Sequence, residues 1–127
     1  MTMTRLREIL RALVGRQHGL MGIPGLEIGT WADVSGSRAL DTSYRNTSGR
    51  KRRVSIYMSY ANADTRASLL VGAADPPTVV VQHGGQAAAS GATLYMPFFT
   101  EVPSNHYYRV ATATGTPAIV AWSEMDE

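Results

Sequence analysis

Apolar and polar residues alternate in several short stretches between about residues 31 and 122, and turn-forming residues separate these stretches. The clearest example is 51–60, in which every second residue is apolar: Val54, Ile56, Met58 and Tyr60. Because successive side chains of a strand point to opposite faces, this spacing predicts a half-buried β-strand.

Further strands are expected at 30–34, 38–45, 66–72, 78–82, 92–99, 106–112 and 118–123. Pro97 cannot donate a backbone hydrogen bond, so it predicts an edge strand or a bulge for its segment. The Gly- and Ala-rich stretch 84–91 is expected to be a loop. About eight short strands at regular spacing predict an all-β fold, specifically a jelly-roll-like β-sandwich.

The stretch 46–49 consists of Asn, Thr, Ser and Gly, and its first and last residues tolerate a left-handed backbone. It therefore predicts the turn of a hairpin, with Tyr44 and Val54 on the paired strands. The expected core contains Trp31, Val54, Ile56, Met58 and Trp122. The two tryptophans are large enough to close the two ends of that core, and each indole N–H can reach a backbone carbonyl.

The N-terminal segment has a different pattern, with apolar residues three and four positions apart: Leu6, Ile9, Leu10, Leu13 and Val14. This spacing places them on one face of an amphipathic helix. Such a short helix needs a partner surface, which is either its own domain or, if the helix is an anchor or oligomer contact, another molecule. The chain is thus expected to comprise a helix (1–18), a Gly/Pro linker (19–29) and a β-sandwich domain (30–127).

The composition is 44% hydrophobic and only 17% charged, with a net charge of +2. A surface with few charges favours burial against other subunits, and the small net charge does not require a nucleic-acid partner. The chain has no cysteine, so it has neither a disulfide framework nor a Cys nucleophile, as suits folding in a reducing cytoplasm. No segment has the length of a membrane span, and no signal peptide is apparent.

The strongest charge feature is the run 50–53, in which Arg50, Lys51 and Arg53 are candidate surface-binding residues. A basic run can bind nucleic acid or an acidic polysaccharide, but the favoured interpretation is that it guards a strand edge or bridges to a neighbour's carboxylates. Tyr57 and Tyr108 are candidate surface aromatics. Tyr107 and Tyr108 are adjacent, so one of them must point away from the core. Such an outward ring is expected to be buried by another subunit or, less favoured, by a sugar.

No catalytic constellation is evident. The three histidines share no ligand spacing, the Gly-x-Ser-x-Gly motif is absent, and the carboxylates lie near turns. A pair of carboxylates for glycoside hydrolysis must face each other across a cleft, which a sequence cannot test. We therefore expect a non-enzymatic protein with no catalytic residues, no metal and no cofactor, and a hydrolase is the least favoured alternative.

Several motifs together resemble one protein family. They are Trp31-Ala-Asp-Val34, the turn Tyr44-Arg-Asn-Thr-Ser-Gly-Arg50, Val54-Ser-Ile56 and the late Trp122-Ser-Glu124. This combination resembles small β-domains of tailed-bacteriophage virion proteins, of the tail-fibre-tip and accessory-capsid types. The resemblance implies a virion structural protein that forms a homotrimer and contacts other virion proteins.

Within that family the leading expectation is a tail-fibre or tail-tip component attached through the N-terminal helix. A capsid decoration protein or head fibre is the close alternative. A glycan-binding module for host attachment is a second class.

Overall fold

The computed structural model describes residues 29–61, 63–87 and 92–127. Its strands all lie in one compact unit, Trp31–Asp126. The predicted helix, with Leu6, Ile9, Leu10, Leu13 and Val14, and nearly all of the predicted linker lie outside the described residues. No helix within the described part of the chain has the length and apolar character needed to cross a membrane.

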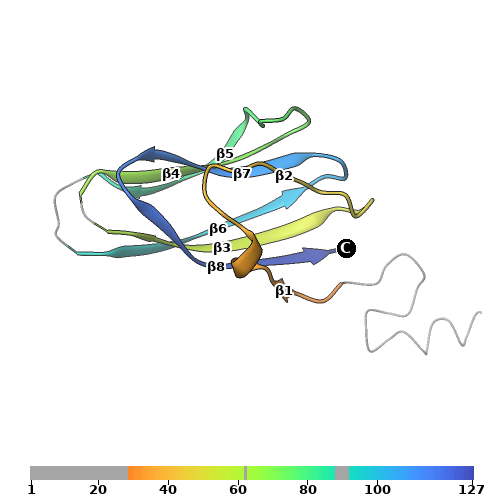
Figure 1. Cartoon of the computed structure of the whole chain (residues 1–127), viewed down its shortest axis with the longest axis horizontal. Coiled ribbons are helices and arrows are strands. Elements are labelled where there is room, and N and C mark those ends of the chain that lie inside the picture. The colour runs from red at the N-terminus through yellow and green to blue at the C-terminus, as the bar shows by residue number, and fades with distance from the viewer. Residues whose placement is uncertain (1–28, 62, 88–91) are drawn as a thin grey trace, which may run out of the picture. The chain divides into compact units, whose positions relative to one another are not determined.

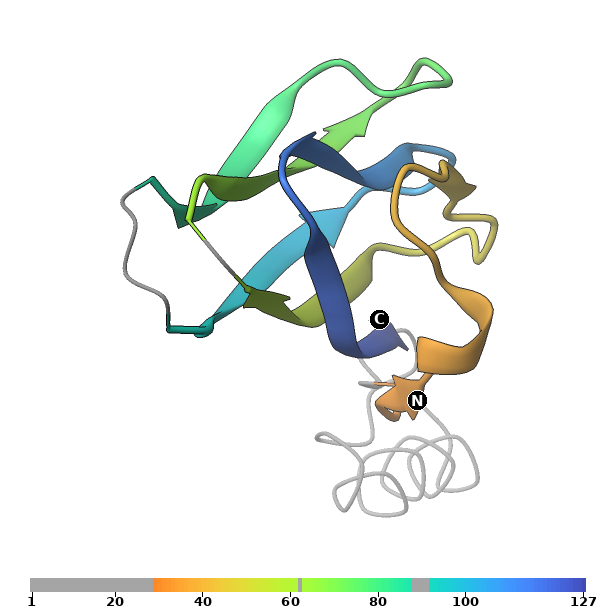
Figure 2. The same cartoon turned by 60° about the vertical axis from the view of Figure 1, so that its left-hand side comes forward.

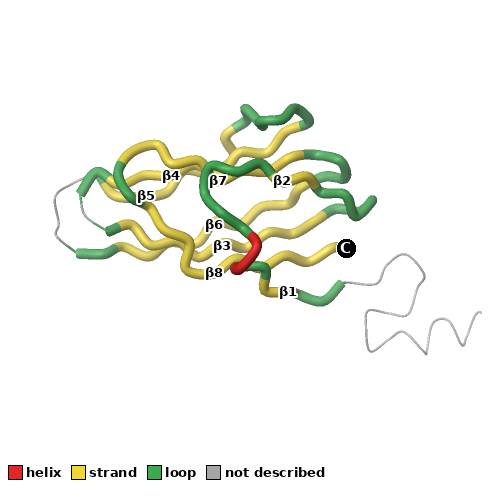
Figure 3. The backbone as a smooth tube through the Cα atoms, viewed as in Figure 1, coloured by secondary structure: helices red, strands yellow, loops and turns green. Residues whose placement is uncertain are grey.

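Eight strands and one short 3-10 helix form within the described residues (Figures 1 and 3). In chain order they are β1 (Ala32–Asp33), η1 (Ser35–Ser37), β2 (Tyr44–Arg45), β3 (Arg52–Tyr60), β4 (Thr65–Gly72), β5 (Val80–Gln86), β6 (Leu94–Val102), β7 (Tyr107–Thr114) and β8 (Pro117–Asp126). They make two four-stranded antiparallel sheets, ordered β1-β8-β3-β6 and β2-β7-β4-β5. Figure 2 shows the two layers facing each other. The predicted all-β, sandwich-like architecture is confirmed.

The predicted hairpin at residues 46–49 is wrong. β2 pairs with β7, whereas β3 pairs with β6 and β8, so the turn carries the chain from one sheet to the other. Asn46 is fully buried there, and its Nδ2 donates to the carbonyls of Arg50 at 2.6 Å and Val102 at 3.0 Å. A turn signature identifies a local reversal of the chain, but it does not say which strand each arm will pair with.

Two predicted boundaries also differ from the structure. The stretch 84–91 was expected to be a loop, but β5 continues through Gly84 and Gly85 to Gln86. At Gly84 a Cβ atom would lie 2.4 Å from the Tyr60 hydroxyl, so a strand can pass this point only without a side chain. Of the predicted strand 38–45, only β2 forms, because the residues before it cross the sandwich edge from β8 to β7.

The core lies between the sheets and contains the fully buried Val54, Ile56, Met58 and Trp122. Trp31, which was expected in the core, is instead 44% exposed. It precedes the edge strand β1, and its ring packs against Phe99, which is itself exposed, with 6.4 Å between ring centroids. Pro97 lies in β6, which is the outermost strand of its sheet, as the missing N–H predicts.

Candidate functional site

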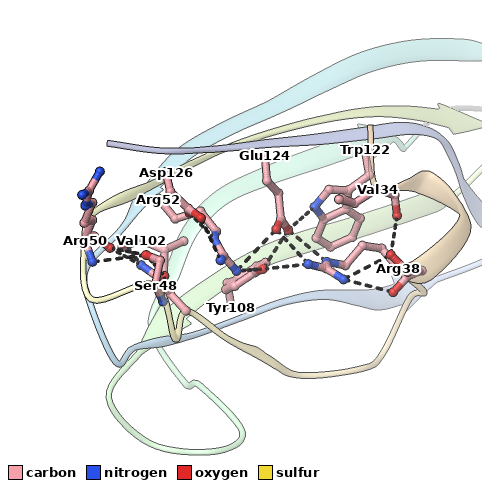
Figure 4. A network of polar contacts seen from close by, with 12 residues as sticks. Val34, Arg38, Ser48, Arg50, Arg52, Val102, Tyr108, Trp122, Glu124 and Asp126 are labelled. Atoms are coloured by element: carbon pink, nitrogen blue, oxygen red, sulfur yellow. Dashed lines mark hydrogen bonds and ion pairs between the residues drawn. The ribbon is translucent and has the colours of Figure 1, made fainter. Parts of the chain in front are cut away.

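Six polar and aromatic side chains form a connected network between the sheets, which we call the clamp (Figure 4). Its members are Arg38, Arg52, Tyr108, Trp122, Glu124 and Asp126. Three of them come from β8, one from β3 and one, Tyr108, from β7 of the opposite sheet. Arg38 comes from the segment that follows η1, so the clamp joins both sheets and the connection between them.

Glu124 is the centre of the clamp, and its side chain is only 7% exposed. Arg38 binds it with two parallel hydrogen bonds, Nη2 to Oε1 at 2.8 Å and Nε to Oε2 at 2.9 Å. Oε2 also accepts from the Tyr108 hydroxyl at 2.7 Å and from the Trp122 indole N–H at 2.9 Å. The two-bond geometry and the extra donors are what a buried carboxylate needs to remain charged.

Arg52 extends the clamp toward the end of β8. Its Nη1 lies 3.4 Å from Glu124 Oε1 and donates to the Tyr108 hydroxyl at 3.0 Å, while its Nε donates to Asp126 at 2.6 Å. Aromatic rings enclose the charges. The Arg38 guanidinium lies 4.6 Å from the ring centroid of Tyr44, and that ring packs edge-on against Trp122. The rings limit water access, which strengthens the ionic contacts.

The clamp changes the acidity of its members. Burial by itself raises the pKa of Glu124, but hydrogen bonds from Arg38 and Tyr108 and the charges of both arginines outweigh burial and lower that pKa below its usual value. Burial, together with donation to the Glu124 carboxylate, raises the pKa of the Tyr108 hydroxyl to about 12. Both pKa shifts favour an ionised Glu124 that accepts a hydrogen bond from a neutral Tyr108.

The clamp corrects two expectations. Tyr108 was expected to be a surface residue, but it is fully buried, because its position on β7 points into the sandwich and its neighbour Tyr107 takes the outer side. The Trp122 indole donates to a carboxylate instead of a backbone carbonyl. With each carboxylate oxygen of Glu124 taken by donors, the arrangement acts as a structural tie between the sheets.

Sequence reasoning missed the clamp, although one signal was present. Arg52 lies an even number of residues from Val54, Ile56 and Met58, so it shares their inward face of β3. Glu124 shares the inward face of β8 with Trp122 in the same way. A charged residue at an inward position requires a buried partner of opposite charge. Matching the inward positions of Arg52 and Glu124 would have predicted an internal ion pair between β3 and β8.

The outer side of the β1-β8-β3-β6 sheet carries a second feature, which we call the aromatic face. It comprises Trp31, Tyr57, Tyr95 and Phe99, each of them 44% to 54% exposed. Tyr57 and Tyr95 stack with their ring planes 13° apart, and Trp31 contacts Phe99. Adjacent exposed rings of this size are typical of surfaces that bind a partner.

The basic run 50–53 does not form one continuous patch. Arg52 points inward into the clamp, whereas Lys51 and Arg53 lie 3.4 Å and 3.6 Å from the carboxylate of Glu101 on β6. Arg50 is exposed in the turn before β3. Alternation along the strand therefore splits the run between the two sides of the sheet, and part of its charge is balanced within the chain.

The described histidines lie apart from each other. His83 Nδ1 is 3.1 Å from the Ser68 hydroxyl on the neighbouring strand, and His106 Nδ1 is 3.0 Å from the carbonyl of Ser104. A shallow depression next to His83 is lined by Arg66, His83, Gly84, Gly85, Ala87 and Met96. Among the described residues, no group of three or more His, Cys, Asp or Glu side chains is placed to hold a metal ion.

Comparison with known proteins gives no match: no family model, no curated protein and no solved structure is significantly similar to this chain.

Proposed function

We propose that this chain is a non-enzymatic structural protein of a bacteriophage virion, most specifically a tail-fibre or tail-tip component. In this proposal residues 1–18 attach it to the particle, and the β-sandwich contacts neighbouring copies and other virion proteins as a homotrimer. The observation that carries the proposal is the aromatic face, because four large exposed rings on one sheet suit a protein that acts by being packed against others.

The strand order supports a jelly roll as the type of sandwich. The chain enters one sheet with β1, crosses to the other with β2, and its later strands fill the positions between and beside the earlier ones. Two four-stranded sheets interleaved in this way are characteristic of jelly rolls, an architecture used by viral capsid and lectin domains. An architecture alone does not define a function, so this point supports the domain type only.

The position of the motif residues supports the family resemblance. Tyr44, Trp122 and Glu124 belong to the resemblance motifs and meet around the clamp. Asn46, from the same turn motif, is buried and ties that turn to β6. If the motifs mark a domain type, their residues should hold the fold together, and the contacts of these residues around the clamp agree with that expectation.

The location on the particle is tested by counting copies. Quantitative mass spectrometry of isolated tails and isolated heads should find the protein on tails, in few copies per particle. A copy number that follows capsid symmetry, with binding to purified heads, would instead establish a decoration protein. Absence from purified particles would contradict the proposal as a whole.

The role of the N-terminal segment is tested on the same particles. Deletion of residues 1–22 should abolish association while the β-domain stays folded by circular dichroism. As a matched pair, Leu10→Ser with Leu13→Ser should weaken association, whereas Arg7→Ser with Arg11→Ser should weaken it less. Full association of the truncated protein would exclude an anchoring role for the segment.

A glycan-binding module is the second candidate, and the stacked, exposed pair Tyr57 and Tyr95 favours it. Sugar rings present C–H groups that pack on aromatic faces, and Ser59 pairs with Tyr95 across the strands, so a hydroxyl lies nearby. In this case Tyr95→Ala should abolish binding to host polysaccharide, and Val120→Ala, an exposed position on β8, should not. Binding that survives Tyr95→Ala would remove this candidate.

A further inference from the structure

The edges of the two sheets differ in how their backbone is covered. At one side of the sandwich the segment 34–45 runs along β8 and β7. The Trp122 carbonyl accepts from Val34 N–H at 2.8 Å, and the Trp122 N–H donates to the Ser35 hydroxyl at 2.8 Å. On β7, Asp41 N–H donates to the Val110 carbonyl at 2.7 Å. These contacts take the place of a neighbouring strand.

The edge strand β6, at the other side, is covered by a single side chain. Gln82 of β5 donates through Nε2 to the Pro97 carbonyl at 3.2 Å, and its Oε1 accepts from Phe99 N–H at 3.1 Å. The carboxamide thus imitates the peptide group of an added strand. Pro97 itself removes a donor from this edge, which further discourages pairing with another chain.

The edge strand β5 is finished differently. Val79, just before the strand, and Val80 and Val81, at its start, are 59%, 41% and 47% exposed. β5 is the outermost strand of its sheet and has no charged residue, whereas the other outermost strands carry Asp33, Arg45 and Glu101. A long, uncharged edge strand with exposed β-branched residues is a template for strand addition.

We propose that β5 pairs antiparallel with β5 of a second copy of this chain, so that the two β2-β7-β4-β5 sheets join into one. An extended backbone is the partner that an open strand edge recognises, because it supplies donors and acceptors at the strand spacing. Charge selects the second copy: its β5 is the one uncharged strand among the described edges. Antiparallel self-pairing also produces a closed two-fold contact, which does not propagate into fibres.

This contact is independent of the proposed trimer. Pairing through β5 alone gives a dimer, and pairing through β5 between trimers gives a particle of six chains.

The mass of the full-length protein is measured by sedimentation velocity and native mass spectrometry. Val80→Lys should shift the even-numbered species to half its mass, because a lysine on the edge of each strand opposes strand addition. Val120→Lys, an exposed valine on β8, is the matched control and should leave the mass unchanged.

Single cysteines give a second measurement that does not depend on a destabilising charge. The chain has no cysteine, so a disulfide can form only through an introduced residue. Cysteine is placed singly at 81, 82 and 83, because the residue that faces itself in antiparallel self-pairing lies near the middle of β5, and also at 120 as the control. Opposed residues of antiparallel strands lie within disulfide distance. At least one of the first three variants should become a covalent dimer on mild oxidation, and Val120→Cys should not. A protein that remains monomeric or purely trimeric, with no cross-link at 81–83, would overturn the proposal.

Discussion

At one side of the sandwich, residues 34–45 cross from β8 to β7, bond to both backbones and insert Arg38 into a buried ionic clamp. At the other side, β5 and β6 are finished by a glutamine carboxamide, a proline and exposed valines. The first side consists of polar groups held within the chain. The second is largely apolar and leaves strand β5 open to an outside partner.

The comparison teaches that edge closure serves two purposes in this domain. The covered edge fixes how the two sheets face each other, because Tyr108 from one sheet and Arg52 from the other share the Glu124 carboxylate. At the open edge the side chain of Gln82 also bonds β5 to β6 of the opposite sheet, but no charged group is part of that tie, and the outer side of β5 is where we propose the interface. We expect substitutions at the first edge to change stability, and substitutions at the second to change assembly.

Glu124→Gln should have the largest effect. It removes the charge while both arginines stay buried, and breaking a buried ion pair in this way costs about 3–5 kcal/mol. The measurement is the free energy of unfolding in urea. Glu101→Gln is the control, since the exposed pairs of Glu101 with Lys51 and Arg53 are worth about 0–1 kcal/mol. Equal losses in the two variants would show that the clamp is not the main tie.

Acid should produce a graded version of the same loss. The folded-state pKa of Glu124 is lowered, so its contribution to stability is complete above the pKa of an unfolded glutamate, about 4.3. That contribution is lost as the pH falls from there through the lower folded pKa. Thermal unfolding between pH 6 and pH 2 should show a steeper decline for the parent protein than for Glu124→Gln. Parallel curves would contradict this prediction.

These first two predictions concern residues that the sequence pattern did not bring together. Alternation located β3 closely, because one face of that strand is apolar along its length. Arg52 and Glu124 also occupy inward positions of their strands. Their charge nevertheless favours a surface assignment, since charged residues ordinarily lie outside. Arg38 was beyond the reach of the pattern, because 86 residues separate it from Glu124 and only the completed topology brings them together.

The errors at the turn and at β5 have related causes. Asn46 has the chemistry of a turn residue, yet its buried amide ties together segments that are distant in sequence, such as the Val102 carbonyl. Gly84 is read as a loop residue by composition, but it is required inside a strand by the Tyr60 and Phe98 side chains beneath it. In both cases a tertiary contact, which a single sequence does not display, determines the use of the residue.

Asp41→Ala should have an intermediate effect on the covered edge. The Asp41 carboxylate accepts from the Thr112 N–H at 2.8 Å and from its hydroxyl at 2.9 Å, and the residue has a φ of 57°. Alanine loses both bonds and is strained at this backbone angle, so a loss of about 1–2 kcal/mol is expected. Asp41→Asn keeps an acceptor and tolerates the angle, and in chemical denaturation it should retain most of the stability.

Gln82→Ala should have the smallest effect on stability, about 1 kcal/mol, since it removes two partly exposed hydrogen bonds from β6. Its consequence is local: amide hydrogen exchange of Phe99 should accelerate. Gln82→Glu, which can still accept from that N–H, should preserve slow exchange. Unchanged exchange in the alanine variant would mean that the carboxamide does not cover this edge.

The bond between Arg38 and Glu124 also orders events during synthesis. Arg38 leaves the ribosome well before the strand that holds its partner, and until then its guanidinium has no buried carboxylate to bind. Residues 34–45 can therefore take their final path only when the last strand has been made and has joined β3. A chain that stalls before that point lacks β8 and leaves β3 without its neighbour on that side, which makes the unfinished product a target for proteolysis.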